Sequence, residues 1–123
     1  MHIDTFADQI VINKDGEENF SACFEFPADL TIFDGHFPGN PICPGVAYVF
    51  VAERLACRFA GKPLVLKRLK RTKFFAPTAP GDILNVAGNV SPAAENDNIL
   101  NVQVAFTGDK MQRICSVKMI MEM

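Results

Sequence analysis

One histidine in this chain is well placed for acid–base chemistry. His36 follows Gly35 and precedes the Pro38-Gly39 turn, so its ring is expected to be held rigidly. Histidine titrates near neutral pH and accepts a proton at modest cost. The surrounding glycines and prolines favour a functional role, as a general base, over the alternative of a structural histidine packed beside Phe37.

A backbone N–H group is the second candidate for chemistry. Pro44-Gly45 marks the start of a helix that the sequence predicts over residues 46–60. An N–H at Gly45 would lie at the positive end of the helix dipole with no side chain beside it. Such a group can polarise a carbonyl and stabilise the negative charge that forms when a neighbouring proton is removed. The alternative is that Gly45 only permits a tight turn.

These residues belong to a longer motif. The segment 33–46 reads FDGHFPGNPICPGV. It resembles the bacterial 3-hydroxyacyl-acyl-carrier-protein dehydratases of fatty-acid synthesis, including the dehydratase/isomerase branch. The similarity is sharpest over this loop and continues more loosely through the helix and through RTKFFAPTAPGD. The resemblance implies a hot-dog fold, a homodimer, and an acyl thioester substrate on acyl carrier protein.

The resemblance also implies roles for single residues. His36 would remove the α-proton of a (3R)-3-hydroxyacyl thioester while the Gly45 N–H holds the thioester carbonyl. The family's active site combines the loop of one subunit with the helix of the other. Besides Gly45, the residues expected to line the substrate site are apolar, and they are Phe33, Phe37, Ile42 and Phe50.

The sequence departs from the family at its second catalytic position. The family has Glu or Asp six residues after the proline that matches Pro44, and this carboxylate protonates the departing hydroxyl. Here the position holds Phe50. Glu53 is the nearest acid on the predicted helix, about 60° around the axis from Phe50 and about 4.5 Å further along it. We therefore name Glu53 as a candidate acid; the alternative is that it pairs with Arg54 or Lys73.

Three functions stay open on this sequence. The first is dehydration of a 3-hydroxyacyl thioester. The second is a catalytically impaired hot-dog module that binds acyl thioesters or pairs with an active homologue, which Phe50 motivates. The third is a thioesterase that uses His36 with water. None of these functions requires a cofactor, and no metal-ligand spacing occurs around either histidine.

A basic run follows the helix. It has two interpretations, a solvated edge strand protected against aggregation or a docking surface for an acidic carrier protein or a phosphopantetheine phosphate. Simple alternation in a strand would place Lys67, Arg71 and Lys73 on one face with Leu69. The residues assigned to docking are Lys67, Arg68, Lys70 and Arg71.

The remaining patterns predict the elements that must position these groups. β-forming segments and turn residues alternate around the single apolar helix 46–60, which indicates an α+β fold with a curved antiparallel sheet wrapped around that helix. Residues 1–123 are expected to form a single domain. The predicted strands cover residues 7–14, 19–27, 64–76, 82–90, 98–107 and 111–121.

Composition excludes some classes of partner. The net charge is −2, with 12 basic and 14 acidic residues, which disfavours nucleic acid as a ligand. Four scattered cysteines suggest packed thiols in a reducing compartment. The N-terminal segment lacks the pattern of a signal peptide, and no apolar run is long enough to span a bilayer. A cytoplasmic protein without a membrane partner is therefore expected.

Overall fold

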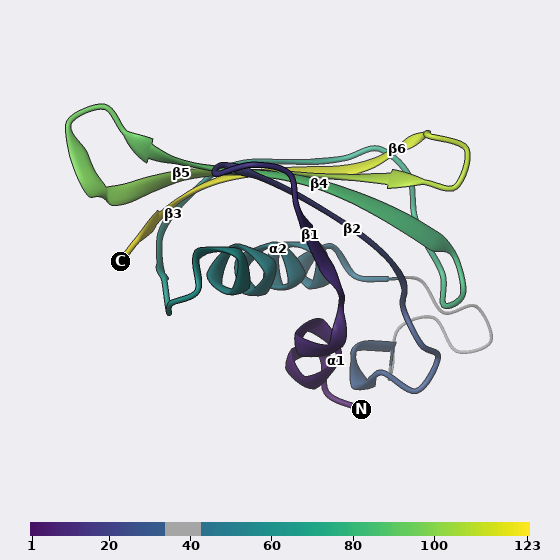
Figure 1. Ribbon diagram of the computed structural model, residues 1–123. Helices are drawn as coiled ribbons and strands as arrows, with labels where there is room; N and C mark the ends of the chain where they lie inside the picture. The colour runs from purple at the N-terminus through teal and green to yellow at the C-terminus, as the bar shows by residue number, and fades with distance from the viewer. Residues whose placement is uncertain (34–42) are drawn as a thin grey trace.

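A computed structural model describes residues 1–33 and 43–123. It shows one long helix lying under a curved sheet of six strands, all paired antiparallel in the order β1-β2-β4-β5-β6-β3 (Figure 1). This arrangement confirms the predicted hot-dog fold. The elements are α1 (Ile3–Gln9), β1 (Ile12–Lys14), β2 (Asn19–Glu25), a 3-10 turn (Thr31–Phe33), α2 (Gly45–Ala60), β3 (Val65–Phe74), β4 (Ile83–Ala93), β5 (Asn96–Gly108) and β6 (Arg113–Glu122).

Helix α2 buries one stripe of its surface against the sheet. Gly61 ends the helix in the left-handed conformation, with φ of 72°, and its N–H donates to the carbonyls of Cys57 and Arg58. The predicted helix 46–60 and its glycine cap are therefore correct to within one residue. The buried stripe faces the inner side of the sheet and consists of Ala47, Tyr48, Val51, Ala52, Leu55, Ala56 and Phe59.

The predicted strand over residues 7–14 is wrong for its first half. Residues 3–9 form helix α1, and only Ile12–Lys14 pair as a strand. Phe6, Ala7 and Ile10 are all buried, at the three- and four-residue spacing of a helix. The apolar residues Ile10, Val11 and Ile12 after Asp8 resemble a strand, but the buried positions of Phe6, Ala7 and Ile10 follow a helix.

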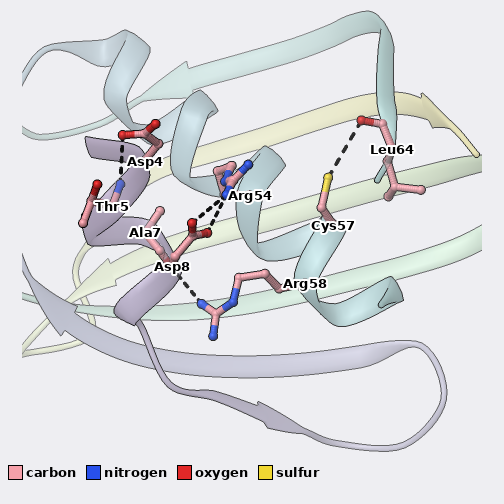
Figure 2. Close-up of polar contacts among 8 residues, drawn as sticks. All are labelled: Asp4, Thr5, Ala7, Asp8, Arg54, Cys57, Arg58 and Leu64. Carbon is pink, nitrogen blue, oxygen red and sulfur yellow. Dashed lines mark hydrogen bonds and ion pairs between the residues drawn. The ribbon is translucent and has the colours of Figure 1, made fainter. Parts of the chain in front are cut away.

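Two arginines fasten α1 to α2. Arg54 binds both carboxylate oxygens of Asp8, at 2.6 and 2.7 Å, and Arg58 Nη1 donates to the Ala7 carbonyl at 2.8 Å (Figure 2). The same view shows the Cys57 thiol directed at the Leu64 carbonyl. The two arginine contacts hold α1 against one flank of α2.

Two irregularities in edge strand β3 change which side chains share a face. The register against β6 slips between Leu66 and Arg68 and again between Leu69 and Arg71. Arg71 therefore lies opposite Lys118, on the outer face, while Leu69 lies opposite the buried Met119, on the face toward α2. The expectation that Leu69 and Arg71 share a face is wrong, because it assumed an unbroken strand.

Strands β4 and β5 extend further than predicted. Their pairing continues to Ala93 and Asn96, so the turn between them is much shorter than the predicted loop over residues 91–97. Pro92 still pairs opposite Leu100, and the register shifts directly after it. The turn-forming residue types in this stretch predict a loop, but hydrogen bonds between β4 and β5 hold most of them in strands.

Among the helices that the structure describes, none has the length and hydropathy needed to cross a bilayer.

Candidate active site

A cavity of about 430 Å³ opens beside the start of α2. Its walls come from the first turn of the helix and from the chain that leaves β3. The lining is mostly apolar and aromatic, and such walls suit an acyl chain better than a charged ligand. The lining residues are Cys43, Gly45, Tyr48, Phe74, Phe75, Ala76 and Pro77.

Gly45 lies where the sequence placed it, at the first position of α2 and in the cavity wall. Pro44 precedes it in extended conformation and gives no side-chain cap. A Cβ built at Gly45 would stand only 2.7 Å from Cζ of Phe74, so the aromatic ring occupies the space that any other residue would need. Any side chain at this position would therefore have to displace the ring of Phe74.

Tyr48 is a feature of this site that the sequence reasoning missed. It is the single tyrosine of the chain, it lines the cavity, and its hydroxyl forms a buried hydrogen bond with the Thr78 hydroxyl. Burial raises the pKa of Tyr48 and raises the pKa of the neighbouring Cys43 to about 11. Both groups are therefore uncharged at neutral pH, and Cys43 fits the predicted role of a packed thiol rather than a nucleophile.

Phe50 and Glu53 lie on a different side of α2. Neither lines the cavity beside Gly45, and both side chains are half-buried. Burial raises the pKa of Glu53. Within residues 1–33 and 43–123 no ion pair involves Glu53, since Arg54 binds Asp8. The alternative that Glu53 is neutralised by Arg54 or Lys73 is therefore wrong for the part of the chain described.

Several predicted site residues are not placed. His36, Phe37 and Ile42 lie outside the described residues, and of Phe33 only the backbone is described, at the end of the 3-10 turn. Their roles stay predictions. The two ends of this segment are nevertheless placed, because Thr31 N donates to the Met1 carbonyl and Cys43 N donates to the Thr78 carbonyl.

The basic run lies along the free edge of the sheet. Lys67 pairs with Glu122 at 3.5 Å, and the side chains of Arg68, Lys70 and Arg71 are exposed. Among the described residues no cluster of His, Cys, Asp and Glu could hold a metal ion. The chemistry available in the described part of the cavity is therefore that of backbone N–H groups, a hydroxyl and a thiol, while the unpaired carboxyl group of Glu53 lies outside it.

Comparison with known proteins decides the family. Residues 12–118 match the family model called ApeI-like, whose description is ApeI dehydratase. The chain belongs to the ApeI-like family. Two relatives are named 3-hydroxyacyl-[acyl-carrier-protein] dehydratase FabZ. That of Lactiplantibacillus plantarum is 34% identical over 87 residues, which cover 65% of this chain and 58% of the relative. That of Oenococcus oeni is 34% identical over 95 residues, which cover 72% and 66%. The chain thus matches only about three fifths of the first relative's length.

Solved structures agree on the fold. One chain of the dehydratase heterocomplex ApeI:P from Xenorhabdus doucetiae superposes with a TM-score of 0.76 at 21% identity, covering 92% of this chain and 95% of that one. A hypothetical thioesterase from Streptococcus pneumoniae, solved with coenzyme A, superposes with a TM-score of 0.73 at 9% identity. The superposition covers 97% of this chain and 92% of that one. At such low identity these likenesses establish the hot-dog architecture alone.

Proposed function

We propose that this chain is a dehydratase of (3R)-3-hydroxyacyl thioesters carried on acyl carrier protein. The observation that carries the proposal is the position of Gly45, whose N–H begins α2 in the wall of an apolar cavity. A preorganised N–H at a helix start is suited to a carbonyl that gains negative charge during reaction. The relatives named FabZ and the ApeI-like family support the same reaction.

The proposed reaction is an elimination. His36 takes the α-proton, and the electron pair of the C–H bond moves into the thioester as an enolate whose oxygen accepts a hydrogen bond from the Gly45 N–H. That pair then forms the α,β double bond as the β C–O bond breaks. The departing hydroxide takes a proton from an acid and leaves as water. Protons and electrons balance without a cofactor.

Glu53 is the proposed acid. Because burial raises its pKa, a larger share of its carboxyl groups is protonated near neutral pH, as a proton donor requires. It shares a flank of α2 with Phe50, away from the cavity beside its own Gly45. In a dimer whose sites combine the loop of one subunit with the helix of the other, Glu53 would serve the site of the partner subunit.

The experiment that tests the function is incubation with 3-hydroxyacyl-acyl carrier protein of several chain lengths, with products read by mass spectrometry. Dehydration predicts loss of one water with the thioester intact. Release of a free acid would instead support the thioesterase alternative, and an unchanged but bound substrate would support the binding module. Running the same substrates on coenzyme A tests the proposed carrier.

We propose that two copies of this chain form a homodimer through the edge strand β3. The proposed location of the dimer is the cytoplasm. Val65, Leu69 and Phe74 on this edge are 61%, 44% and 55% exposed, and Val46 on the neighbouring flank of α2 is 71% exposed. Apolar side chains along an unpaired strand edge favour pairing with a second strand. The ApeI:P structure carries the name of a heterocomplex, so a homologous partner is the second candidate for this edge.

Light scattering is expected to show a dimer at tens of micromolar protein, and Leu69→Lys should shift it to monomer. The exposed Ile83, on the outer face of β4 and remote from β3, gives the matched control Ile83→Lys. Because two copies of β3 would bring their basic residues together, the dimer should tighten as salt increases. A wild-type monomer at every salt concentration would contradict the homodimer and favour a different partner chain.

The basic run is the proposed dock for the acidic carrier protein. Lys67 has an anionic neighbour, Glu122, but the charged side chains of Arg68, Lys70 and Arg71 are exposed to solvent. Reversing two of them in Arg68→Glu/Arg71→Glu should raise KM for a carrier-protein substrate several-fold and leave KM for the corresponding pantetheine thioester unchanged. Equal changes for both substrates would contradict a docking role.

A further inference from the structure

The start of α2 is tied at three points to the last residue of β3 and to the segment that follows it. Cys43 N donates to the Thr78 carbonyl at 2.7 Å. The ring of Phe74 lies against the Cα of Gly45, within 2.7 Å of where a Cβ would stand. The hydroxyls of Tyr48 and Thr78 are hydrogen-bonded to each other. Thr78 thus holds the chain on both sides of Gly45.

The segment that carries Thr78 is itself anchored. At one end Phe75 N donates to the Ile114 carbonyl at 2.8 Å, and at the other Gly81 N donates to the Phe26 carbonyl at 3.1 Å. Between them Ala79 N donates to the Asp82 carboxylate at 2.9 Å. Thr78 is therefore a fixed point of the fold to which the helix start is attached.

The hydroxyl contact is shielded from water. Tyr48 is 2% and Thr78 4% exposed. A buried hydroxyl needs a hydrogen-bonding partner, and here each hydroxyl supplies the other's. Pro44 gives the helix no side-chain cap, and these contacts leave the Gly45 N–H without an acceptor from the described residues while they hold the first turn in place.

We propose that the Thr78–Tyr48 hydroxyl pair positions the Gly45 N–H for the thioester carbonyl. The inference rests on the proposed function in taking Gly45 as the carbonyl-binding group. Tyr48 and Thr78 are positioning residues: they fix the direction of an N–H that must meet an oxygen whose charge grows during reaction. A displacement of about 1 Å at such a donor is enough to cost up to about 100-fold in rate.

Thr78→Val tests the pair with little change of shape. It removes the hydroxyl but keeps the backbone carbonyl that Cys43 uses. We expect kcat to fall about 10-fold with KM little changed, since the contact strengthens in the transition state. Tyr48→Phe should lower kcat by the same factor. The double variant should lower kcat no further, because both substitutions remove the same hydrogen bond. Thr78→Ser keeps a hydroxyl and should recover most of the activity.

Thr72→Val is the matched control. Thr72, on β3, has a buried hydroxyl with no hydrogen-bond partner in the part of the chain described, so its loss should not change kcat. If Thr78→Val and Thr72→Val change kcat equally, the positioning role is wrong. Melting temperatures of all the variants show whether a loss follows from unfolding, and recovery by Thr78→Ser without a matching recovery of stability supports positioning.

Infrared spectroscopy separates this inference from the proposed reaction. A crotonyl thioester carrying ¹³C at its carbonyl should show a lowered C=O frequency when bound to the wild type, because the Gly45 N–H polarises it. In Thr78→Val the frequency should return toward its value in water. An equal shift in both proteins, or none in the wild type, overturns the positioning role. The C=O frequency could be lowered in the wild type and restored in Thr78→Val although neither protein dehydrates a 3-hydroxyacyl substrate. That result would overturn the dehydratase function and would still support the positioning role.

Discussion

His36→Ala is expected to lower the rate of dehydration by about 10²–10⁴-fold, the usual contribution of a positioned general base. The α-proton of a thioester is only weakly acidic, and water is a poor substitute for an imidazole as the base. Mass spectrometry of the dehydrated product under single-turnover conditions gives the rate directly. In the wild type the rate should also fall on acidification, as the imidazole takes up a proton and can no longer accept one.

The control for His36→Ala is His2→Ala, because the sequence assigns no role to His2. Substrate affinity should change little in His36→Ala, since the acyl chain and the carbonyl are held by other groups. Retention of the wild-type rate would exclude His36 as the base. Loss of thioester binding together with the rate would instead indicate a structural histidine whose removal collapses the loop.

The architecture was predictable because its signals are local. Gly61 ends a helix by its backbone conformation, and the apolar run before it is long enough to specify a buried helix. Strand pairs such as β5 and β6 follow from the alternation of buried and outward-facing residues along most of their length. Helix α1 escaped prediction because seven residues give too few turns for a helical period to stand out from a strand pattern.

The surroundings of Gly45 were not predictable to the same extent. Its contacts with Phe74 and the bond between Tyr48 and Thr78 join residues about 30 positions apart. A sequence without structure gives no means of pairing such residues. The two slips in the register of β3 are a similar case, because nothing in a run of alternating Lys, Arg and Leu marks where a strand gains an extra residue.

Glu53→Gln is expected to lower the rate of dehydration by about 10²–10⁴-fold, because hydroxide is a poor leaving group without a proton donor. Among the described residues no cation pairs with Glu53, and burial raises its pKa, and both properties suit a proton donor. The rate should therefore fall as pH rises through that pKa, and Glu53→Gln should lack this dependence. The exposed Glu25, the last residue of β2, gives the matched control Glu25→Gln.

The same pKa shift has a consequence for stability with a defined sign. A carboxyl whose pKa is higher in the folded than in the unfolded chain stabilises the fold at pH below its unfolded pKa, and this contribution is lost as pH rises through the folded pKa. Denaturant titrations at several pH values measure the free energy of unfolding. For the wild type it should fall relative to that of Glu53→Gln as pH rises from the unfolded to the folded pKa of Glu53. A constant difference across that range would contradict the shift.

Phe50→Glu distinguishes a working enzyme from an impaired relative. It restores a carboxylate at the position where the resemblance places one, three residues before Glu53 on the same flank of α2. If Glu53 already donates the proton, the substitution should change the rate little. If the chain lacks an acid, Phe50→Glu should raise a very slow rate by about 10²-fold or more, and Glu53→Gln should have no effect.

Phe50→Gln is the control for Phe50→Glu, because it introduces a polar side chain of similar size that cannot protonate a leaving group. The outcome we expect, a large loss in Glu53→Gln and little gain in Phe50→Glu, would mean that the acid has moved one turn along the helix and that its function is retained.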